Sequence, residues 1–433
     1  MFHTRRDFLK GALGASTLLS FAPAAPSLLV RSAPVPSEVQ GMATPGASRP
    51  QVDRRDDRNT VLVVVQLSGG NDGLNTVVPY ADDEYARNRP TLRLPTEELH
   101  KIDSLIGFHP RMGAFLQLYK DGFLSIVQGV GCPNQDRSHE GAMRLWHTAD
   151  PDHPNRQTGW LGRTVDGIRN PNRTNAPAVF VGPIAQPFAL NAKDVIIPSI
   201  RLPGDLVAAQ TPGQPDDPSQ SKRIAELPRA NRDNPLLDFV RQCAMNAYDN
   251  GRRIEAAAQT TANTAEYPPY GLAGHLRTVA QLIRADIGIR IFFVELGGGG
   301  IGGFDNHANQ MGNHCALLHQ LSESVAAFVH DLKRDKALDR VLLMTFSEFG
   351  RTVKENGRRG TDHGAAAPVF LAGGKLRTGL VGSHPSLTDL DSGALKFKID
   401  FRRVYATALD RWLGFESRTV LDGQFEALDI LSV

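Results

Sequence analysis

The sequence predicts an α/β fold with a mostly parallel central sheet and helices on both of its faces. Short apolar runs rich in valine alternate along the chain with longer segments of helical spacing. Glycine (41) and proline (28) are frequent among the 433 residues, which favours a loop-rich fold over a helical bundle. Polar residues follow the apolar runs, and open α/β sheets bind their ligands beyond the carboxyl ends of the strands.

The predicted elements follow from the spacing of apolar residues. We expect the first strand at Val61–Leu67, because this run is continuous, dense in valine and typical of a central buried strand. Further strands are expected over residues 123–130, 177–182, 289–296, 341–346 and 368–371. Helical spacing predicts helices over residues 110–120, 138–148, 235–260, 271–286 and 311–334. The last of these has one apolar face, formed by Leu317, Leu321, Val325, Phe328 and Leu332.

Composition limits the class of the protein and its partners. Hydrophobic residues make up 41% and charged residues 22% of the chain, which is an ordinary globular balance. The formal net charge of +2 gives no electrostatic reason to expect a nucleic acid partner. The three cysteines are too few for a disulfide scaffold or a four-cysteine zinc site. No apolar run reaches the ~18 residues of a transmembrane helix.

Residues 1–33 have the pattern of a twin-arginine signal peptide. Arg5 and Arg6 precede a Phe-Leu pair, a weakly apolar stretch follows, and small residues up to Ala33 offer cleavage sites. This pattern predicts export by the twin-arginine translocase, to the periplasm or out of the cell. Residues 34–59 are rich in proline and then in charge, which is typical of a linker. We expect one domain over residues 60–433, with a Pro-rich excursion at 203–234.

Carboxylates and imidazoles gather next to the predicted strands, where chemistry is expected. Both are common ligands of divalent metal ions such as zinc, manganese, magnesium and calcium. A set of such residues at successive strand ends therefore predicts a metal site. The candidates in chain order are Asp72, then Arg137, Ser138 and His139, then Asp305 and His307, then Glu348 and Arg351, then Asp362 and His363.

Each candidate also has a purely structural interpretation. Asp72 can stabilise the glycine-rich turn that follows the first strand. Ser138 can be the N-cap of a helix, a role that is compatible with nucleophilic attack because a helix N-terminus also stabilises an anion. Glu348 and Arg351 can form an ion pair or support a metal ligand. Arg137 can pair with a neighbouring aspartate or bind an oxyanion.

Taken in order, the motifs resemble the exported bacterial family known as domain of unknown function 1501. The resemblance covers nearly all of the predicted mature chain. Besides the twin-arginine start, the motifs are LSGGNDGLN from Leu67, Arg137-Ser138-His139, FDNH from Phe304, SEFGRT from Ser347, and Asp362-His363-Gly364. That family is similar in fold to the alkaline phosphatase and sulfatase superfamily, whose members use one or two metal ions and a nucleophile at a helix N-terminus.

The resemblance implies an alkaline phosphatase-like fold and a role for each motif residue. Ser138 matches the nucleophile. The residues that match metal ligands are Asp72, Asp305, His307, Asp362 and His363. A second alignment places Glu348 in the position of Asp362, with His363 as the last histidine, and the sequence leaves the choice between Asp362 and Glu348 open.

The leading functional hypothesis is a periplasmic metal-dependent hydrolase of phosphate or sulfate esters. In this hypothesis Ser138 attacks the ester, and Arg137 with nearby helix amides binds its oxygens. The alternative is an exported, non-catalytic binding or assembly protein of the same fold, stabilised by the metal. The hydrolase hypothesis expects Asp72, Ser138, Asp305, His307 and His363 to converge on one site.

Overall fold

The computed structural model describes residues 59–168, 177–200, 265–297 and 303–432, together with residues 253, 256 and 257. The signal at 1–33, the linker up to residue 58 and the excursion at 203–234 lie outside the described residues. So does nearly all of the helix expected at 235–260. None of the described helices is long and apolar enough to cross a membrane.

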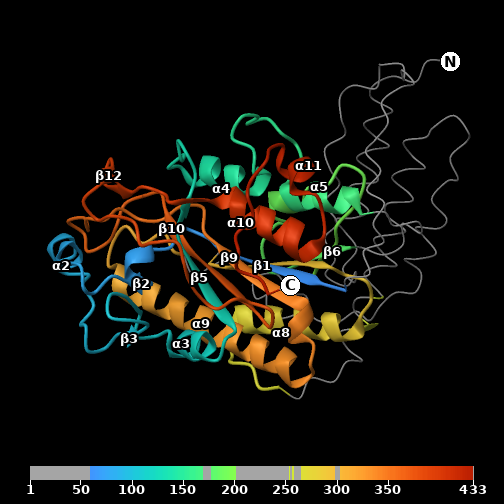
Figure 1. Ribbon diagram of the computed structural model, residues 1–433, viewed down its shortest axis with the longest axis horizontal. Coiled ribbons are helices and arrows are strands. Elements are labelled where there is room, and N and C mark those ends of the chain that lie inside the picture. Colours follow the sequence, from blue (N-terminus) through green and yellow to red (C-terminus); the bar gives the residue numbers. More distant parts are fainter. Residues whose placement is uncertain are drawn as a thin grey trace, which may run out of the picture.

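A mixed, mostly parallel sheet forms the centre of the described chain (Figure 1). β10 runs antiparallel to both of its neighbours, whereas the other paired strands of this sheet are parallel. β14 (Ile399–Asp400) pairs with β5 off the main path. The spatial order is β11 (Gly379–Val381), β5 (Leu124–Gly131), β10 (Ala367–Gly373), β9 (Val341–Phe346), β1 (Val61–Leu67), β8 (Ile291–Leu296), β6 (Ala178–Val181) and β7 (Ser199–Ile200).

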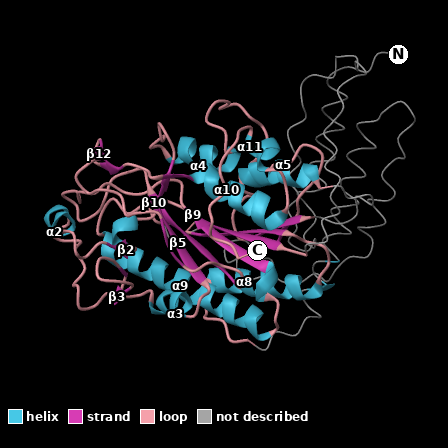
Figure 2. Ribbon diagram, viewed as in Figure 1, coloured by secondary structure: helices cyan, strands magenta, loops and turns pink. Residues whose placement is uncertain are grey.

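Helices cover both faces of this sheet (Figure 2), which confirms the predicted fold class. One face packs against α3 (Gly113–Lys120), α8 (Gly271–Ala285) and α9 (Gln310–Arg334). The other face packs against α4 (His139–Thr148), α5 (Trp160–Gly167), α10 (Phe401–Ala406), the π-helical turn Thr407–Leu413 and α11 (Ser417–Leu421). The apolar stripe of α9 faces the core, as its spacing predicts.

β1 shows why a continuous apolar run forms a central strand. All seven of its residues are buried, and it pairs in parallel with β8 on one side and β9 on the other. Its side chains alternate between the two layers, so Val63 packs on the α8–α9 side and Val64 on the α4–α10 side. A strand covered on both faces needs apolar residues at every position.

Smaller elements flank the edge of the sheet that carries the motifs. A three-stranded sheet is formed by β2 (Val77–Val78), β4 (Gly107–Phe108) and β3 (His100–Lys101), and α2 (Asp83–Asn88) lies between β2 and β3 in the chain. A hairpin pairs β12 (Leu390–Asp391) with β13 (Ala394–Leu395). These elements, like α10, α11 and the π-helical turn, are not among those the sequence predicts.

The direction of the strands brings the motifs together. β1, β5, β8 and β9 are mutually parallel in sense, so their carboxyl ends lie at one edge of the sheet. Because β10 is reversed, its amino end lies at this same edge. The segments that follow the four parallel strands and the segment that precedes β10 therefore meet there.

Candidate metal centre

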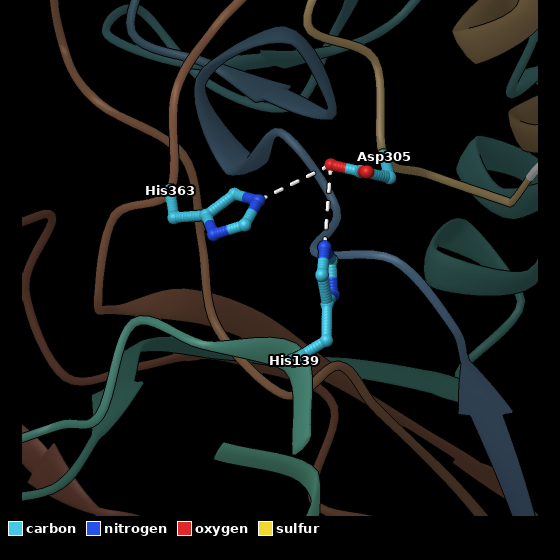
Figure 3. A group of neighbouring side chains, drawn as sticks. All are labelled: His139, Asp305 and His363. Carbon is cyan, nitrogen blue, oxygen red and sulfur yellow. Dashed lines mark hydrogen bonds and ion pairs between the residues drawn. The ribbon is translucent and has the colours of Figure 1, made fainter. Parts of the chain in front are cut away.

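Three histidines surround one carboxylate oxygen at this edge. The Nε2 atoms of His139, His307 and His363 lie 3.4, 3.0 and 3.2 Å from Oδ1 of Asp305. Figure 3 shows His139 and His363 pointing toward Asp305 from two different segments. His139 is the first residue of α4, Asp305 and His307 lie between β8 and α9, and His363 lies before β10.

Each imidazole is oriented by an oxygen bound at its other nitrogen. The Nδ1–H of His139 donates to Oε1 of Glu348 at 2.9 Å, and that of His307 donates to Oδ1 of Asp362 at 3.2 Å. Nδ1 of His363 lies 2.6 Å from the backbone carbonyl of Arg137, which can only accept. When Nδ1 carries the hydrogen, a neutral imidazole has its lone pair on Nε2, the arrangement found in histidines that ligate metals.

The converging Nε2 atoms need a positive charge between them. Nε2 of His139 is buried and has no hydrogen-bond partner among the described residues. Nε2 of His307 lies 2.9 Å from Nε2 of His363, so two lone pairs face each other unless a proton or a cation intervenes. A buried nitrogen without a partner is costly, and a metal ion held by these atoms removes that cost.

Asp305 is held in its ionised form by a buried arginine. Burial alone would raise the pKa of this carboxyl, but the hydrogen bond and the charge of Arg351 outweigh it and lower the pKa to about 2. Nη2 of Arg351 donates to Oδ1 of Asp305 at 2.7 Å, and Nε donates to the carbonyl of Gly70 at 2.7 Å. Further bonds reach the carbonyls of Phe304 and Thr361. Arg351 therefore links the segments after β1, β8 and β9.

The donor set fits a divalent metal ion. One ligand atom each from His139, Asp305 and His363 lies within 4.8 Å of the others, and His307 extends the group to three imidazoles and one carboxylate. Imidazole nitrogen with carboxylate oxygen suits zinc and other first-row transition metals. The side chains of His139 and Asp305 are each 39% exposed, so the group is open to solvent and to a substrate.

Glu348 and Asp362 both orient a histidine instead of joining the group around Asp305. Glu348 is buried, and its Oε1 also accepts from the amide of Gly69 at 2.8 Å. Its hydrogen bond raises the pKa of His139. Burial raises the pKa of Asp362, but hydrogen bonds from Asn356 and His307 outweigh it and lower that pKa. Each carboxylate is bonded to the Nδ1 of a histidine in the group, and the choice between Glu348 and Asp362 as a metal ligand stays a prediction.

Asp72 lies in a buried ion pair away from this group. Nη1 and Nη2 of Arg89 donate to its two carboxylate oxygens at 2.6 and 2.9 Å, and Gln310 donates to the same carboxylate. Burial would raise the pKa of Asp72, but Arg89 lowers it to about 2. Arg89 also donates to the carbonyls of Thr352 and Val353. These bonds position the segment after β9, and within the described ranges no hydrogen bond or ion pair joins Asp72 to His139, His307 or His363.

Ser138 and Arg137 lie beside the group with different orientations. Ser138 is exposed at the N-terminus of α4, and its Oγ accepts from the amide of Gly141 at 3.1 Å. No acceptor of its hydroxyl hydrogen is found within the described ranges. The guanidinium of Arg137 donates to the carbonyls of Asp391 and Ser392, so its charge is directed to the β12–β13 hairpin.

A second carboxylate–histidine group fits a metal less well. Asp150, His153 and Asp422 each place a ligand atom within 4.8 Å of the others. Arg156 bonds the carboxylates of both Asp150 and Asp422. Its guanidinium already supplies the positive charge that a metal would bring.

His139 is among the candidates that the sequence offers, but no role is predicted for it, and the structure places it beside Asp305 and Glu348. The sequence places His139 next to Ser138 after the second strand, but the resemblance directs attention to the serine. The signal that identifies it is its position as the first residue of a helix, with a buried Glu348 in reach of its ring. Asp305, His307 and His363 lie within 3.2 Å of one another through Oδ1 and the two Nε2 atoms, and their role as metal ligands stays a prediction.

Several solved structures are similar to this chain at low identity. They include the C-terminal periplasmic domain of EcEptC from Escherichia coli in complex with Zn (11% identity, TM-score 0.34, covering 72% of this chain and 73% of that chain). An alkaline phosphatase from the Antarctic bacterium TAB5 is 10% identical, with a TM-score of 0.31 and coverage of 72% and 91%. The lipoteichoic acid synthase LtaP from Listeria monocytogenes is 8% identical, with a TM-score of 0.33 and coverage of 74% and 67%.

None of the curated proteins compared with the chain matches it. A family model does match, over residues 59–423, which includes every residue of the candidate metal centre. The chain belongs to the family described as Protein of unknown function (DUF1501).

Proposed function

We propose that the protein is an exported, metal-dependent hydrolase of phosphate or sulfate esters. The observation that carries this proposal is the convergence of three Nε2 atoms on Asp305, each imidazole being oriented through its Nδ1. A structural metal site is usually closed, whereas these side chains are 22–39% exposed. An accessible, nitrogen-rich site at the ligand-binding edge of an α/β sheet suits catalysis.

The metal would polarise the ester and stabilise the negative charge that develops on its oxygens. His139, His307, His363 and Asp305 are the residues that would hold it. α4 adds a second source of positive potential, because its N-terminal amides lie beside His139. An anionic ester oxygen next to the metal would face this helix end.

Ser138 is the proposed nucleophile. It directly precedes the ligand His139, it is exposed, and its hydroxyl hydrogen is not engaged by a described acceptor. Its Oγ already accepts from Gly141, which fixes the side chain in one orientation at the helix end. The proposed reaction is attack by this oxygen on the phosphorus or sulfur of the ester, which displaces the alcohol together with the hydroxyl proton and leaves the phosphoryl or sulfuryl group on Ser138 until water releases it. A metal ion held by the histidines and Asp305 would supply the positive charge that favours loss of this proton.

A second candidate function is a non-catalytic binding or assembly protein of the same fold, stabilised by the metal. The orientation of Arg137 favours it, because this guanidinium bonds the β12–β13 hairpin and does not face the histidines. The two candidates differ in turnover but share the metal site.

The test compares wild type with Ser138→Ala and His363→Ala. Zinc content, melting temperature and turnover of 4-nitrophenyl phosphate and 4-nitrophenyl sulfate are measured for each protein. We expect Ser138→Ala to keep its zinc and lose at most the ~0.5–2 kcal/mol of a helix cap, while turnover collapses. His363→Ala is expected to lose zinc and turnover together.

Each contrary result identifies the step that fails. Zinc-loaded wild type without turnover of any ester in a broad panel supports the non-catalytic candidate. Full activity of Ser138→Ala excludes Ser138 as the nucleophile. Wild type that binds no divalent metal contradicts both candidates.

Export to the periplasm is part of this proposal and has its own test. The paired guanidinium groups of Arg5 and Arg6 are the feature that a twin-arginine signal presents. The double variant Arg5→Lys, Arg6→Lys is expected to stay in the cytoplasm. An unchanged periplasmic yield would remove the export proposal and leave the metal chemistry untouched.

A further inference from the structure

A basic turn lies against the candidate metal centre. It spans residues 354–359 and carries Lys354, Arg358 and Arg359, all exposed. No ion pair or side-chain hydrogen bond of these three cations is found in the part of the chain that the structure describes. They are the exposed cations nearest in the chain to His363, and the proposed chemistry does not use them.

The turn is bonded directly to two residues of the centre. Nδ2 of Asn356 donates to the carbonyl of His307 and to Oδ1 of Asp362, both at 3.1 Å. Gly360 lies so close to the backbone of His307 that a Cβ built on it would be 2.3 Å from the His307 carbonyl carbon. These contacts therefore fix the backbone of the turn next to His307 and Asp362.

The turn is also rigid. Oδ1 of Asn356 accepts from the amides of Arg358 and Gly360, at 2.9 and 3.2 Å. The carbonyls of Arg358 and Arg359 accept from the first amides of the α9 region, Asn309 and Gln310. Arg359 has a φ of +57°, a conformation that costs energy for a residue with a Cβ and that persists where the surroundings enforce it.

The acidic residue of the turn does not neutralise its cations. Both carboxylate oxygens of Glu355 accept from the amide of Thr91, and Oε2 also accepts from the amide of Leu92. Glu355 is thus directed away, toward the segment after α2.

We propose that this basic turn is a second anionic subsite, which binds a negatively charged group of the substrate beside the ester that is cleaved. The inference rests on the proposed hydrolase function and specifies its substrate class: an ester that carries at least one further sulfate, phosphate or carboxylate group. Exposed cations without partners raise the local concentration of anions and favour a multiply charged substrate over a singly charged one. A fixed turn does this at lower entropic cost than flexible side chains on a mobile loop.

The test measures binding of a polyanion by calorimetry, so it does not depend on turnover. The probe is sucrose octasulfate, which carries several sulfate groups on one molecule. Sodium sulfate at matched ionic strength is the reference, because each of its anions is a single sulfate group. The variant is Lys354→Gln, Arg358→Gln, Arg359→Gln in the full, zinc-loaded chain. The control variant removes the same charge at the opposite edge of the sheet, through Lys120→Gln, Lys336→Gln and Lys375→Gln, which are also exposed.

We expect the turn variant to bind the probe roughly tenfold more weakly, since each exposed charge pair contributes modestly. Its affinity should also depend less on salt concentration, while the control variant matches wild type. Turnover of 4-nitrophenyl phosphate or sulfate should be unchanged in the control variant, whose residues lie at the opposite edge of the sheet.

Equal affinity of the turn variant and wild type would overturn the subsite, as would equal losses in the turn and control variants. So would a wild type that does not bind the probe. A loss confined to the turn variant supports the subsite even if no ester is hydrolysed, in which case the proposed hydrolase function fails alone.

Discussion

Glu348 is the residue on which the orientation of His139 depends. It is buried, and its Oε1 accepts from the His139 ring and from the Gly69 amide. Asp362 has the same role toward His307, but its side chain is 59% exposed. A buried carboxylate is less screened by water than an exposed one, so Glu348 should matter more to metal binding.

We predict that Glu348→Gln weakens zinc binding by about 10–100-fold, the usual cost of losing the support of a metal ligand. The amide can still accept from Nδ1 but no longer supplies the negative charge that makes the imidazole a stronger ligand. Zinc affinity is measured by competition with a chromophoric chelator. Asp362→Asn should have a smaller effect, and Glu97→Gln, which changes an exposed carboxylate elsewhere, should have none. Wild-type affinity in Glu348→Gln would contradict the supporting role.

At the scale of single elements, the ion pair of Asp72 with Arg89 fixes the segment that carries His363. Both side chains are buried, and Arg89 bonds the carbonyls of Thr352 and Val353 just after β9. Gln310 adds a second connection, because it donates to Asp72 and accepts from the hydroxyl of Thr361 at 2.6 Å. The start of α9 and the segment before β10 are therefore tied to the turn after β1.

We predict that Asp72→Asn destabilises the protein by about 3–5 kcal/mol, because it leaves the buried Arg89 charge uncompensated. The effect depends on pH. The pKa of Asp72 is lowered to about 2 in the fold, below its ordinary value of about 3.9, so ionised Asp72 stabilises the fold above pH 4. This stability, on the order of 2–3 kcal/mol, is lost as the pH falls from about 4 to 2.

Urea unfolding from pH 7 to pH 2, with a chelator present, checks this prediction. The difference between wild type and Asp72→Asn should shrink below pH 4. Asp389→Asn is the matched control, since the Asp389 pair with Lys396 is exposed. A difference that stays constant with pH would show that Asp72 acts through packing and not through its charge.

The sequence predicts the secondary-structure elements better than it predicts the contacts between them. Val61–Leu67 is predicted to the residue, because a strand buried on both faces must be apolar throughout. The metal role that the sequence predicts for Asp72 rests on its place after this strand, whereas its buried partner Arg89 lies 17 residues further on, outside any pattern. β10 was expected as a strand, but its reversed direction depends on pairing with β5 and β9, which the sequence does not display.

For the molecule as a whole, the metal centre connects segments that are far apart in the chain. His139 follows β5, His307 follows β8, and His363 precedes β10. A bound ion would therefore crosslink three loops at one edge of the sheet. The place of His307 after a strand allows it to be anticipated, since parallel strands of alternating α/β units end at a common edge. His363 precedes β10 and reaches this edge only because β10 is reversed. The convergence of the three Nε2 atoms depends on the conformation of the folded loops, which no pattern in the sequence predicts.

This connection predicts how zinc affects global stability. An ion that binds the native state alone stabilises it by about 2.7 kcal/mol when free zinc is at a hundred times its dissociation constant. Wild type should therefore unfold at a higher temperature with zinc than with a chelator, and His363→Ala should lose this shift.

His153→Ala tests the alternative group of Asp150, His153 and Asp422, where Arg156 already supplies the positive charge. It should respond to zinc as wild type does. If His153→Ala abolishes the shift and His363→Ala keeps it, the ion binds at the second group, and the centre around Asp305 is held by protons and Arg351 instead of a metal.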